Sequence, residues 1–198
     1  LVPAYDATAS LSIQSALRVS KSFSPGVVSA GQPARLTITL TNASPVSTLM
    51  LDPGNPFVDS PIDGVGSSTY GLKVSGPLTT TCGGTLSTTA GNLGIQLVGG
   101  SIAPSSSCTI TVPFVGTLQV AGAPQSFTNT IPAGAIKLTD PTVVSQPASA
   151  SVNLVGQLLV AKSATPTGPI APGSPVRYAI TVSNYLSSPL TNLVITDP

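Results

Sequence analysis

The sequence contains no histidine, no tryptophan and no glutamate, and only seven of its 198 residues are lysine or arginine. Without histidine, and with only two cysteines, the chain lacks the ligands from which zinc sites are usually built. Without histidine and glutamate it also lacks the commonest general acids and bases. The net charge is +1 and no basic cluster is present, which argues against nucleic-acid binding because phosphate contacts need many cationic side chains. We therefore expect no enzyme and no nucleic-acid partner.

A membrane-spanning helix is also not expected, although positions 74–136 contain no charged residue. Such a helix needs about 20 mostly apolar residues in succession. Gly83-Gly84, Gly99-Gly100 and Pro104 interrupt the uncharged stretch, together with many serines and threonines. We therefore expect no membrane insertion in this segment.

The chain does contain apolar residues that alternate with serine and threonine. In Ala34–Asn42, leucine and isoleucine occupy every second position and threonines stand between them, which is the period of a strand with one buried face. Val176–Asn184 and Cys108–Phe114 repeat this alternation. Further short strands are predicted at residues 49–51, 94–98, 127–131 and 150–154. Because 19 glycines and 20 prolines separate such segments, the pattern predicts an all-β sandwich.

The sequence also contains an internal repeat. Lys21, Asn42 and Asp52-Pro53 recur as Lys162, Asn184 and Asp197-Pro198, with similar residues between them. Repeats of this kind indicate a tandem array. We interpret residues 1–15 as the closing strand of a preceding repeat, 16–156 as a complete repeat and 157–198 as the opening strands of a following one. The chain then reads as a window from a longer protein.

Three motifs carry a resemblance to a known family: Thr81-Cys82-Gly83-Gly84-Thr85, Ser107-Cys108-Thr109-Ile110-Thr111-Val112 and Thr128-Asn129-Thr130-Ile131-Pro132-Ala133-Gly134. In this order they resemble the tandem "conserved repeat" domains of large bacterial surface proteins, a domain of unknown function. The resemblance implies immunoglobulin-like sandwiches strung in tandem on a secreted or surface-anchored protein, without assigned catalytic residues. The segment Asp52–Lys73 departs from the pattern, and we expect an insertion there.

Cys82 and Cys108 are the first candidates for a chemical role. A single pair in an otherwise cysteine-free chain of this composition is typical of a disulfide formed in an oxidising compartment. A redox pair and two free thiols are the alternatives, although redox pairs are usually spaced as C-x-x-C.

A second candidate is a lysine–asparagine isopeptide crosslink, as occurs in other bacterial surface sandwiches. The recurring positions suggest Lys21, Asn42 and Asp52 in one repeat. The corresponding set in the next repeat is Lys162, Asn184 and Asp197. The reaction needs a neutral, buried amine, an amide within bonding distance and a carboxylic acid to move protons. The alternative is a lysine at a sandwich edge and an asparagine in a turn. Lys137 with Asn129 is a further pair, without a visible counterpart in the repeat.

A third candidate is a calcium site formed by Asp52, Asn55, Asp59 and Asp63. Calcium takes 6–8 oxygen ligands, and these four side chains lie within a dozen residues. Their spacing matches no EF-hand loop, and Asp or Asn before Pro or Gly is also an ordinary turn residue. No other cofactor is expected.

The sequence as a whole predicts a structural repeat of an extracellular bacterial surface fibre, stalk or filament. Its partners would be neighbouring repeats or identical copies. A ligand- or cell-binding adhesive module is one alternative. A pilus-like subunit that polymerises by strand exchange is the other.

Overall fold

The computed structural model describes residues 16–119, 123–184 and 189–197, and nearly all regular structure in them is β-strand. The proposed closing strand in residues 1–15 lies outside the described residues. One short 3-10 turn, η1, covers Ala90–Asn92. The strands are β1 (Leu17–Ser24), β2 (Val27–Ser29), β3 (Pro33–Asn42), β4 (Leu49–Met50), β5 (Phe57–Asp59), β6 (Gly71–Val74), β7 (Thr79–Thr80), β8 (Thr85–Thr88), β9 (Ile95–Val98), β10 (Ser101–Ile102), β11 (Ser107–Thr117), β12 (Gln125–Ile131), β13 (Ala148–Val155), β14 (Leu158–Thr165) and β15 (Arg177–Asn184). The expected all-β class is confirmed.

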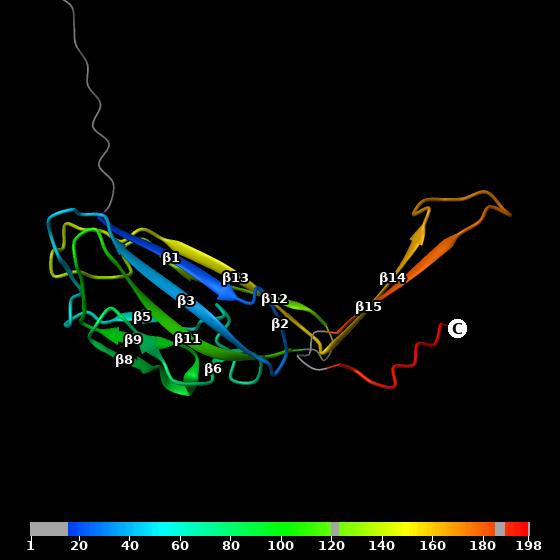
Figure 1. Ribbon diagram of the computed structural model, residues 1–198, viewed down its shortest axis with the longest axis horizontal. Coiled ribbons are helices and arrows are strands. Elements are labelled where there is room, and N and C mark those ends of the chain that lie inside the picture. The colour runs from blue at the N-terminus through cyan, green and yellow to red at the C-terminus, as the bar shows by residue number, and fades with distance from the viewer. Residues whose placement is uncertain (1–15, 120–122, 185–188, 198) are drawn as a thin grey trace, which may run out of the picture.

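Two sheets form the body of the molecule (Figure 1). The larger has the order β1-β3-β11-β6, with β7 also paired to β11, and all its pairs are antiparallel. The smaller has the order β12-β13-β2, in which β13 and β2 are parallel. Strand β1 of the first sheet contacts β13 of the second, so the two sheets pack as layers.

The core lies between these layers, and the alternation read from the sequence fills it. Every second residue of β3 and β11 is buried, and the residues between them are threonines, serines or other partly exposed side chains. The same holds for β1, β12 and β13. Phe23 and Phe114 meet edge to face, with ring centroids 5.5 Å apart. The hydroxyl-bearing residues therefore form the outer faces, as the period of two predicts.

A small third sheet, β5-β9-β8, lies beside the larger one (Figure 1). Its strand β5 belongs to the segment Asp52–Lys73, where the sequence led us to expect an insertion. The loop after β5 is organised by Asp63, which is 2% exposed and accepts hydrogen bonds from the backbone N–H groups of Val65, Gly66 and Leu72 at 2.8, 2.9 and 3.0 Å. Gly71 has a φ of +96°, and a Cβ there would lie 2.0 Å from Asp63 Oδ2, so only glycine fits.

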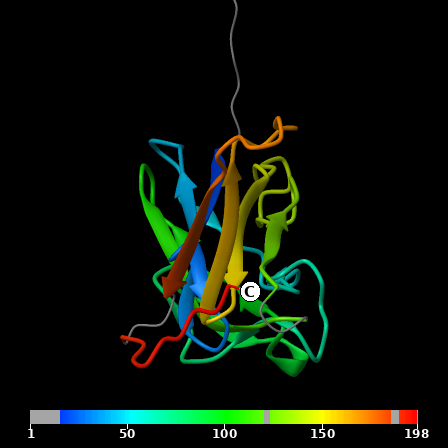
Figure 2. The same ribbon diagram turned by 90° about the vertical axis from the view of Figure 1, so that its right-hand side faces the viewer.

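The last two described strands, β14 and β15, form a separate hairpin that extends beyond one end of the two-layer body (Figures 1 and 2). Its register reproduces that of β1 and β3. Lys21 pairs with Ile38, and Lys162 pairs with Ile180; all eight pairs of one hairpin have an equivalent in the other. The connections also agree, because Gly31 and Gly173 both have positive φ, +80° and +84°.

The seven basic residues all lie in hydrogen-bonded backbone. Six belong to strands of the ladders described above: Arg18 and Lys21 in β1, Arg35 in β3, Lys73 in β6, Lys162 in β14 and Arg177 in β15. The seventh, Lys137, accepts a backbone hydrogen bond from Asp52 N at 3.0 Å, next to an isolated bridge between Leu51 and Leu138.

Candidate functional site

Lys21 occupies a core-facing position in β1. Leu17, Val19 and Phe23 are buried on the same face of this strand, and the lysine stands between them at the same parity. Its side chain has no exposed surface, and its Nζ lies 2.8 Å from Asp59 Oδ2. The sandwich therefore holds a cationic side chain inside its core, where cations are rarely placed without a partner.

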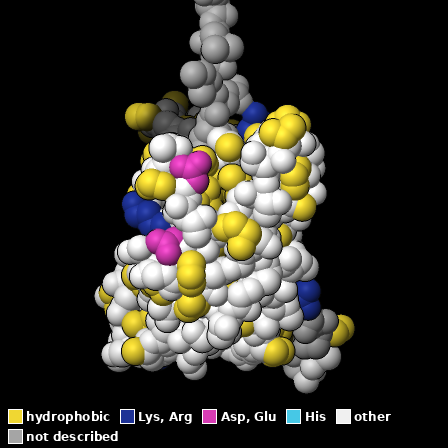
Figure 3. All heavy atoms as spheres, turned by 90° about the vertical axis from the view of Figure 1, so that its left-hand side faces the viewer, with side chains coloured by type: hydrophobic (Ala, Val, Ile, Leu, Met, Phe, Trp, Pro, Cys, Tyr) yellow, Lys and Arg dark blue, Asp and Glu magenta, His cyan; other side chains and the backbone are white. Residues whose placement is uncertain are grey.

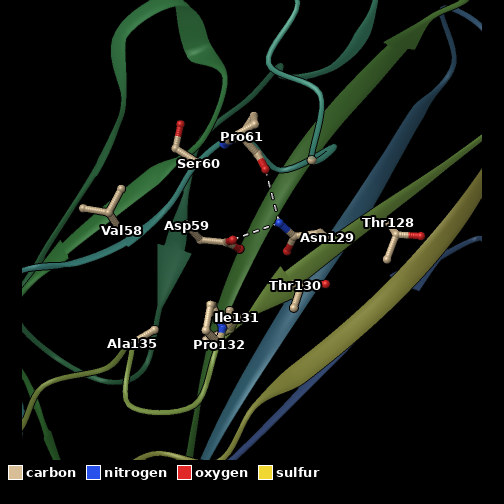
Figure 4. A pocket seen from close by; sticks show the side chains of 11 residues that line it. Val58, Asp59, Ser60, Pro61, Thr128, Asn129, Thr130, Ile131, Pro132 and Ala135 are labelled. Carbon is tan, nitrogen blue, oxygen red and sulfur yellow. Dashed lines mark hydrogen bonds between the residues drawn. The ribbon is translucent and has the colours of Figure 1, made fainter.

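Asp59 and Asn129 complete a buried polar cluster with this lysine. Asp59 is the last residue of β5 and Asn129 lies in the middle of β12; both face inward, with exposed fractions of 4% and 2%. Asn129 Nδ2 donates to Asp59 Oδ1 at 2.9 Å and, more weakly, to the carbonyl of Pro61 at 3.3 Å (Figure 4). One carboxylate thus bridges the lysine through one oxygen and the asparagine through the other.

The other end of the Asn129 amide is unsatisfied. Asn129 Oδ1 is buried and has no hydrogen-bond partner among the described residues. A buried acceptor without a partner costs about 1–3 kcal/mol. Such atoms are few in native structures, and each requires an explanation.

Burial also changes the acid–base character of Lys21. Desolvation lowers the pKa of the Lys21 ammonium below its ordinary value, and the Coulombic attraction and hydrogen bond of Asp59 oppose this effect without cancelling it. A lysine with a lowered pKa is deprotonated more readily, and a neutral amine is a nucleophile. The site therefore combines an activated amine, a carboxyl group and an amide.

A cavity of about 380 Å³ opens onto this cluster. Asp59 and Asn129 belong to its lining, together with Pro61, Thr130 and Ile131 (Figure 4). The cavity therefore lies beside Asp59 and Asn129, although both residues are almost fully buried.

The structure corrects the crosslink set that the repeat suggested around Lys21. Asn42 does not face the lysine. Its Nδ2 donates to the carbonyls of Ser47, Ile102 and Ala103, at 2.7, 3.0 and 3.1 Å, and its Oδ1 accepts from Ser44 N at 2.9 Å. This amide is fully engaged in fixing the loop after β3.

Asp52 is likewise not the acid beside Lys21. It accepts hydrogen bonds from Asn55 Nδ2 at 2.6 Å and from Gly54 N at 2.8 Å, which lower the pKa of its exposed carboxyl group. The carboxylate therefore caps a turn.

The corresponding set in the second hairpin is only partly assembled. Lys162 Nζ contacts Asp197 Oδ1, and both side chains are exposed, at 46% and 43%. The same ammonium lies 4.9 Å from the ring centroid of Tyr178. Asn184 lies at the end of β15, opposite Leu158. The pairing of Lys162 with Asp197 agrees with the sequence prediction, but this lysine is not buried.

The four residues suggested for calcium do not converge on one site. Asp52 and Asn55 bond to each other, Asp59 faces Lys21 and Asn129, and Asp63 binds three backbone N–H groups. No group of three or more acidic or cysteine side chains suited to a metal is found among the described residues. The carboxylates are instead engaged by lysine, amide and backbone donors.

Asp59 and Asn129 were each noticed in the sequence, but in the wrong combinations. The sequence feature that would have grouped them with Lys21 is their position on the buried face of each strand. Phe57 and Asp59, and likewise Phe127, Asn129 and Ile131, occupy alternate positions on one face. A polar residue at an apolar position of a period-two pattern identifies a buried polar group.

The two cysteines are joined, as the sequence predicts. Cys82 and Cys108 form a disulfide with a Cα–Cα distance of 4.9 Å, and both residues are buried. Cys108 is at an inward position of β11, and Cys82 follows β7. The bond therefore ties the segment after β7 to a central strand of the larger sheet.

Comparison with known proteins gives a family for the sandwich. A family described as "Domain of unknown function (DUF7933)" matches residues 18–155. The chain belongs to this family. The match covers the DUF7933 domain from β1 to β13 and includes Lys21, Asp59 and Asn129. None of the curated proteins matches the chain.

Solved structures with some likeness to this chain share little sequence with it. One, titled "AvmM Catalyzes Macrocyclization in Alchivemycin A Biosynthesis", is 14% identical over 80% of this chain and 93% of its own, with a TM-score of 0.38. The DNA glycosylase AlkC of Pseudomonas fluorescens is 12% identical over 72% of this chain and 31% of its own, with a TM-score of 0.33. A chain from a cohesin–dockerin complex of Clostridium thermocellum is 10% identical over 75% of this chain and 100% of its own, with a TM-score of 0.40. At such scores these likenesses carry no argument about function.

The described residues include no helix with the length and apolar character needed to cross a membrane.

Proposed function

We propose that this chain is a structural segment of an extracellular bacterial surface fibre or stalk, built from immunoglobulin-like sandwiches in tandem. The observation that carries the proposal is the second hairpin, whose register repeats that of β1 and β3 pair for pair. An equivalent hairpin is the first part of an equivalent sandwich. On this proposal, residues 157–198 open the next repeat.

The exposure of the second hairpin supports this reading. Leu36 and Ile38 of β3 are fully buried, whereas their equivalents Tyr178 and Ile180 of β15 are 61% and 37% exposed. These apolar positions need a covering layer, because large exposed apolar surfaces are otherwise sites of association. The remaining strands of a following repeat would supply it.

The join between the two units is short. β13 ends at Val155 and β14 begins at Leu158, so two residues separate the last strand of one unit from the first strand of the next. A join of this length restricts rotation, unlike a Gly/Ser linker, which behaves as a flexible coil. A chain of such units would form a stiff rod.

The composition and the disulfide fit a secreted structural role. A buried disulfide is typical of proteins that fold in oxidising compartments. The face shown in Figure 3 carries few basic or acidic side chains, and the rest of it is uncharged, with hydrophobic side chains scattered over it. A neutral surface carries little self-repulsion, so neighbouring fibres can pack side by side.

Electron microscopy and intact mass of the native polypeptide test the proposal. The longest strand has 11 residues and, at about 3.3 Å per residue, spans about 36 Å. With the turns at both ends, each repeat should add roughly 40–50 Å of length. We expect a rod with a regular beaded spacing of this size and a mass far above 19.6 kDa. A compact particle without a repeating spacing would contradict the proposal.

Assembly by strand exchange is the second candidate, and the exposed face of the hairpin β14–β15 is the observation that favours it. A second copy could cover this face in place of the same chain. In that case the native polypeptide would have a mass near 19.6 kDa and would form filaments that dissociate in denaturant to this single chain.

A further inference from the structure

The buried cluster of Lys21, Asp59 and Asn129 is not explained by a structural role in a fibre alone. Three polar side chains occupy core positions on strands of three different sheets. A buried ion pair is frequently no more stabilising than apolar residues of the same size. We propose that Lys21 and Asn129 become joined by an intramolecular isopeptide bond, and that Asp59 carries the protons of this reaction.

The positions of the atoms fit these roles. Lys21 Nζ lies 2.8 Å from Asp59 Oδ2, and Asn129 Nδ2 lies 2.9 Å from Asp59 Oδ1. One oxygen of the carboxylate can therefore accept a proton from the lysine, while the other can deliver a proton to the asparagine nitrogen. These distances are those of proton transfer in general acid–base catalysis.

The environment favours the reactive form of the amine. The side chains of Lys21 and Asp59 are 0% and 3% exposed, so the pair is shielded from water. Burial disfavours the charged form of the amine, so the neutral, nucleophilic form of Lys21 is more accessible here than at the surface. The lowered pKa of the Lys21 ammonium has the same cause.

The reaction balances without any added reagent. The lone pair of neutral Lys21 Nζ attacks Asn129 Cγ, and the π electrons of the carbonyl move to Oδ1. Asp59 receives a proton from Nζ and gives a proton to Nδ2. The carbonyl then re-forms, the Cγ–Nδ2 bond breaks and ammonia leaves. One C–N bond replaces another, nothing is oxidised or reduced, and Asp59 ends as the neutral acid.

Two further features of the site fit this reaction. The cavity beside Asp59 and Asn129 leaves room for the released ammonia. Asn129 Oδ1 has no hydrogen-bond partner among the described residues, so the reaction breaks no hydrogen bond of this oxygen when the carbonyl electrons move to it.

Intact mass of the native polypeptide, expressed and purified without denaturation, tests the proposal. We expect a deficit of about 17 Da for the released ammonia, in addition to the two hydrogens lost in the disulfide. After reduction and trypsin digestion, peptide 19–35 should remain linked to peptide 74–137 and be uncut after Lys21. Succinimide formation at an asparagine also releases ammonia but links no peptides.

Variants assign the roles. Lys21→Arg keeps a cation beside Asp59 but removes the attacking amine, and Asn129→Ala removes the amide that is attacked. Before reduction, both variants should be lighter than their sequence mass only by the two hydrogens lost in the disulfide. Asp59→Asn should also prevent the bond. Its matched control is Asp52→Asn, the same change at an exposed turn, which should leave the crosslink intact.

Each result decides the matter. A folded wild-type protein with the full mass of its sequence, less only the disulfide hydrogens, would overturn the proposal. So would a deficit that persists in Lys21→Arg, or a linked pair of peptides that does not contain Asn129. The wild-type measurement does not depend on whether any variant folds. It is also independent of the fibre proposal, because a crosslinked sandwich can occur in a single-repeat protein.

Discussion

Pulling the chain from its two ends would measure how much of the sandwich the proposed Lys21–Asn129 bond closes off. Leu17 and Val155 are 138 positions apart, and 26 of these lie between the disulfide-bonded cysteines. At about 3.6 Å per residue, the chain unfolded without the bond should have a contour of about 400 Å between these residues, and the measured step is this contour less their separation in the folded state. With the bond, only 4 positions before Lys21 and 26 after Asn129 remain free, which is about 110 Å.

Force spectroscopy on the 198-residue chain, held by handles at both ends, distinguishes these lengths. Asn129→Ala should give the long step and the wild type the short one. The disulfide provides an internal ruler: its reduction should add about 90 Å to the step of Asn129→Ala. The same reduction should add nothing in the wild type, because the disulfide lies inside the closed loop. A long wild-type step that grows on reduction would refute this reasoning.

Three further predictions concern stability, each measured by chemical denaturation. Reduction of the disulfide should cost about 3.5 kcal/mol, since it closes a loop of 26 positions; a loss below 1 kcal/mol would contradict this estimate. Asp63→Ala should cost at least about 3 kcal/mol, because three backbone N–H groups lose a buried acceptor. Asp140→Ala, at an exposed turn, should cost less than about 1 kcal/mol. Asn129→Ala cannot crosslink, so its Lys21 keeps a free amine. Because the pKa of Lys21 is lowered in the folded state, the unfolded state binds more protons than the folded state between the folded pKa and pH 10.5. Stability should therefore rise as the pH increases from the folded pKa to 10.5, by at most about 1.4 kcal/mol per pH unit. Lys21→Met should abolish this pH dependence of the stability. If the slope persists in Lys21→Met, a group other than Lys21 causes it.

The strands that carry the core could be predicted from the sequence because their pattern is strictly alternating. β3 and β15 were expected within one residue of their observed bounds, and β11 within one residue at its start and three at its end. The short strands β5, β6, β7 and β8 were not expected. They contain two to four residues each, so no periodic pattern can develop in them.

The buried cluster could be predicted only in part, for a different reason. Lys21 was singled out because it recurs in the repeat. Its partners were then sought at recurring positions, Asn42 and Asp52, since the repeated segment covers the hairpin β14–β15, and β5 and β12 have no counterpart after it among the described strands. Asp59 and Asn129 are 38 and 108 positions from Lys21. Only the packing of separate sheets brings them together, and local periodicity does not encode that packing.

The placement of the basic residues has a consequence for resistance to proteolysis. Trypsin-like proteases cut after lysine and arginine, and they bind the chain as an extended segment withdrawn from its own hydrogen bonds. Six of the seven such residues lie in paired strands, and the seventh, Lys137, accepts a backbone hydrogen bond from Asp52 N; cleavage within the paired strands requires local unfolding. Cleavage at the six strand positions therefore depends on how often these sheets open, and we expect the sandwich to resist such enzymes longer than the exposed hairpin β14–β15.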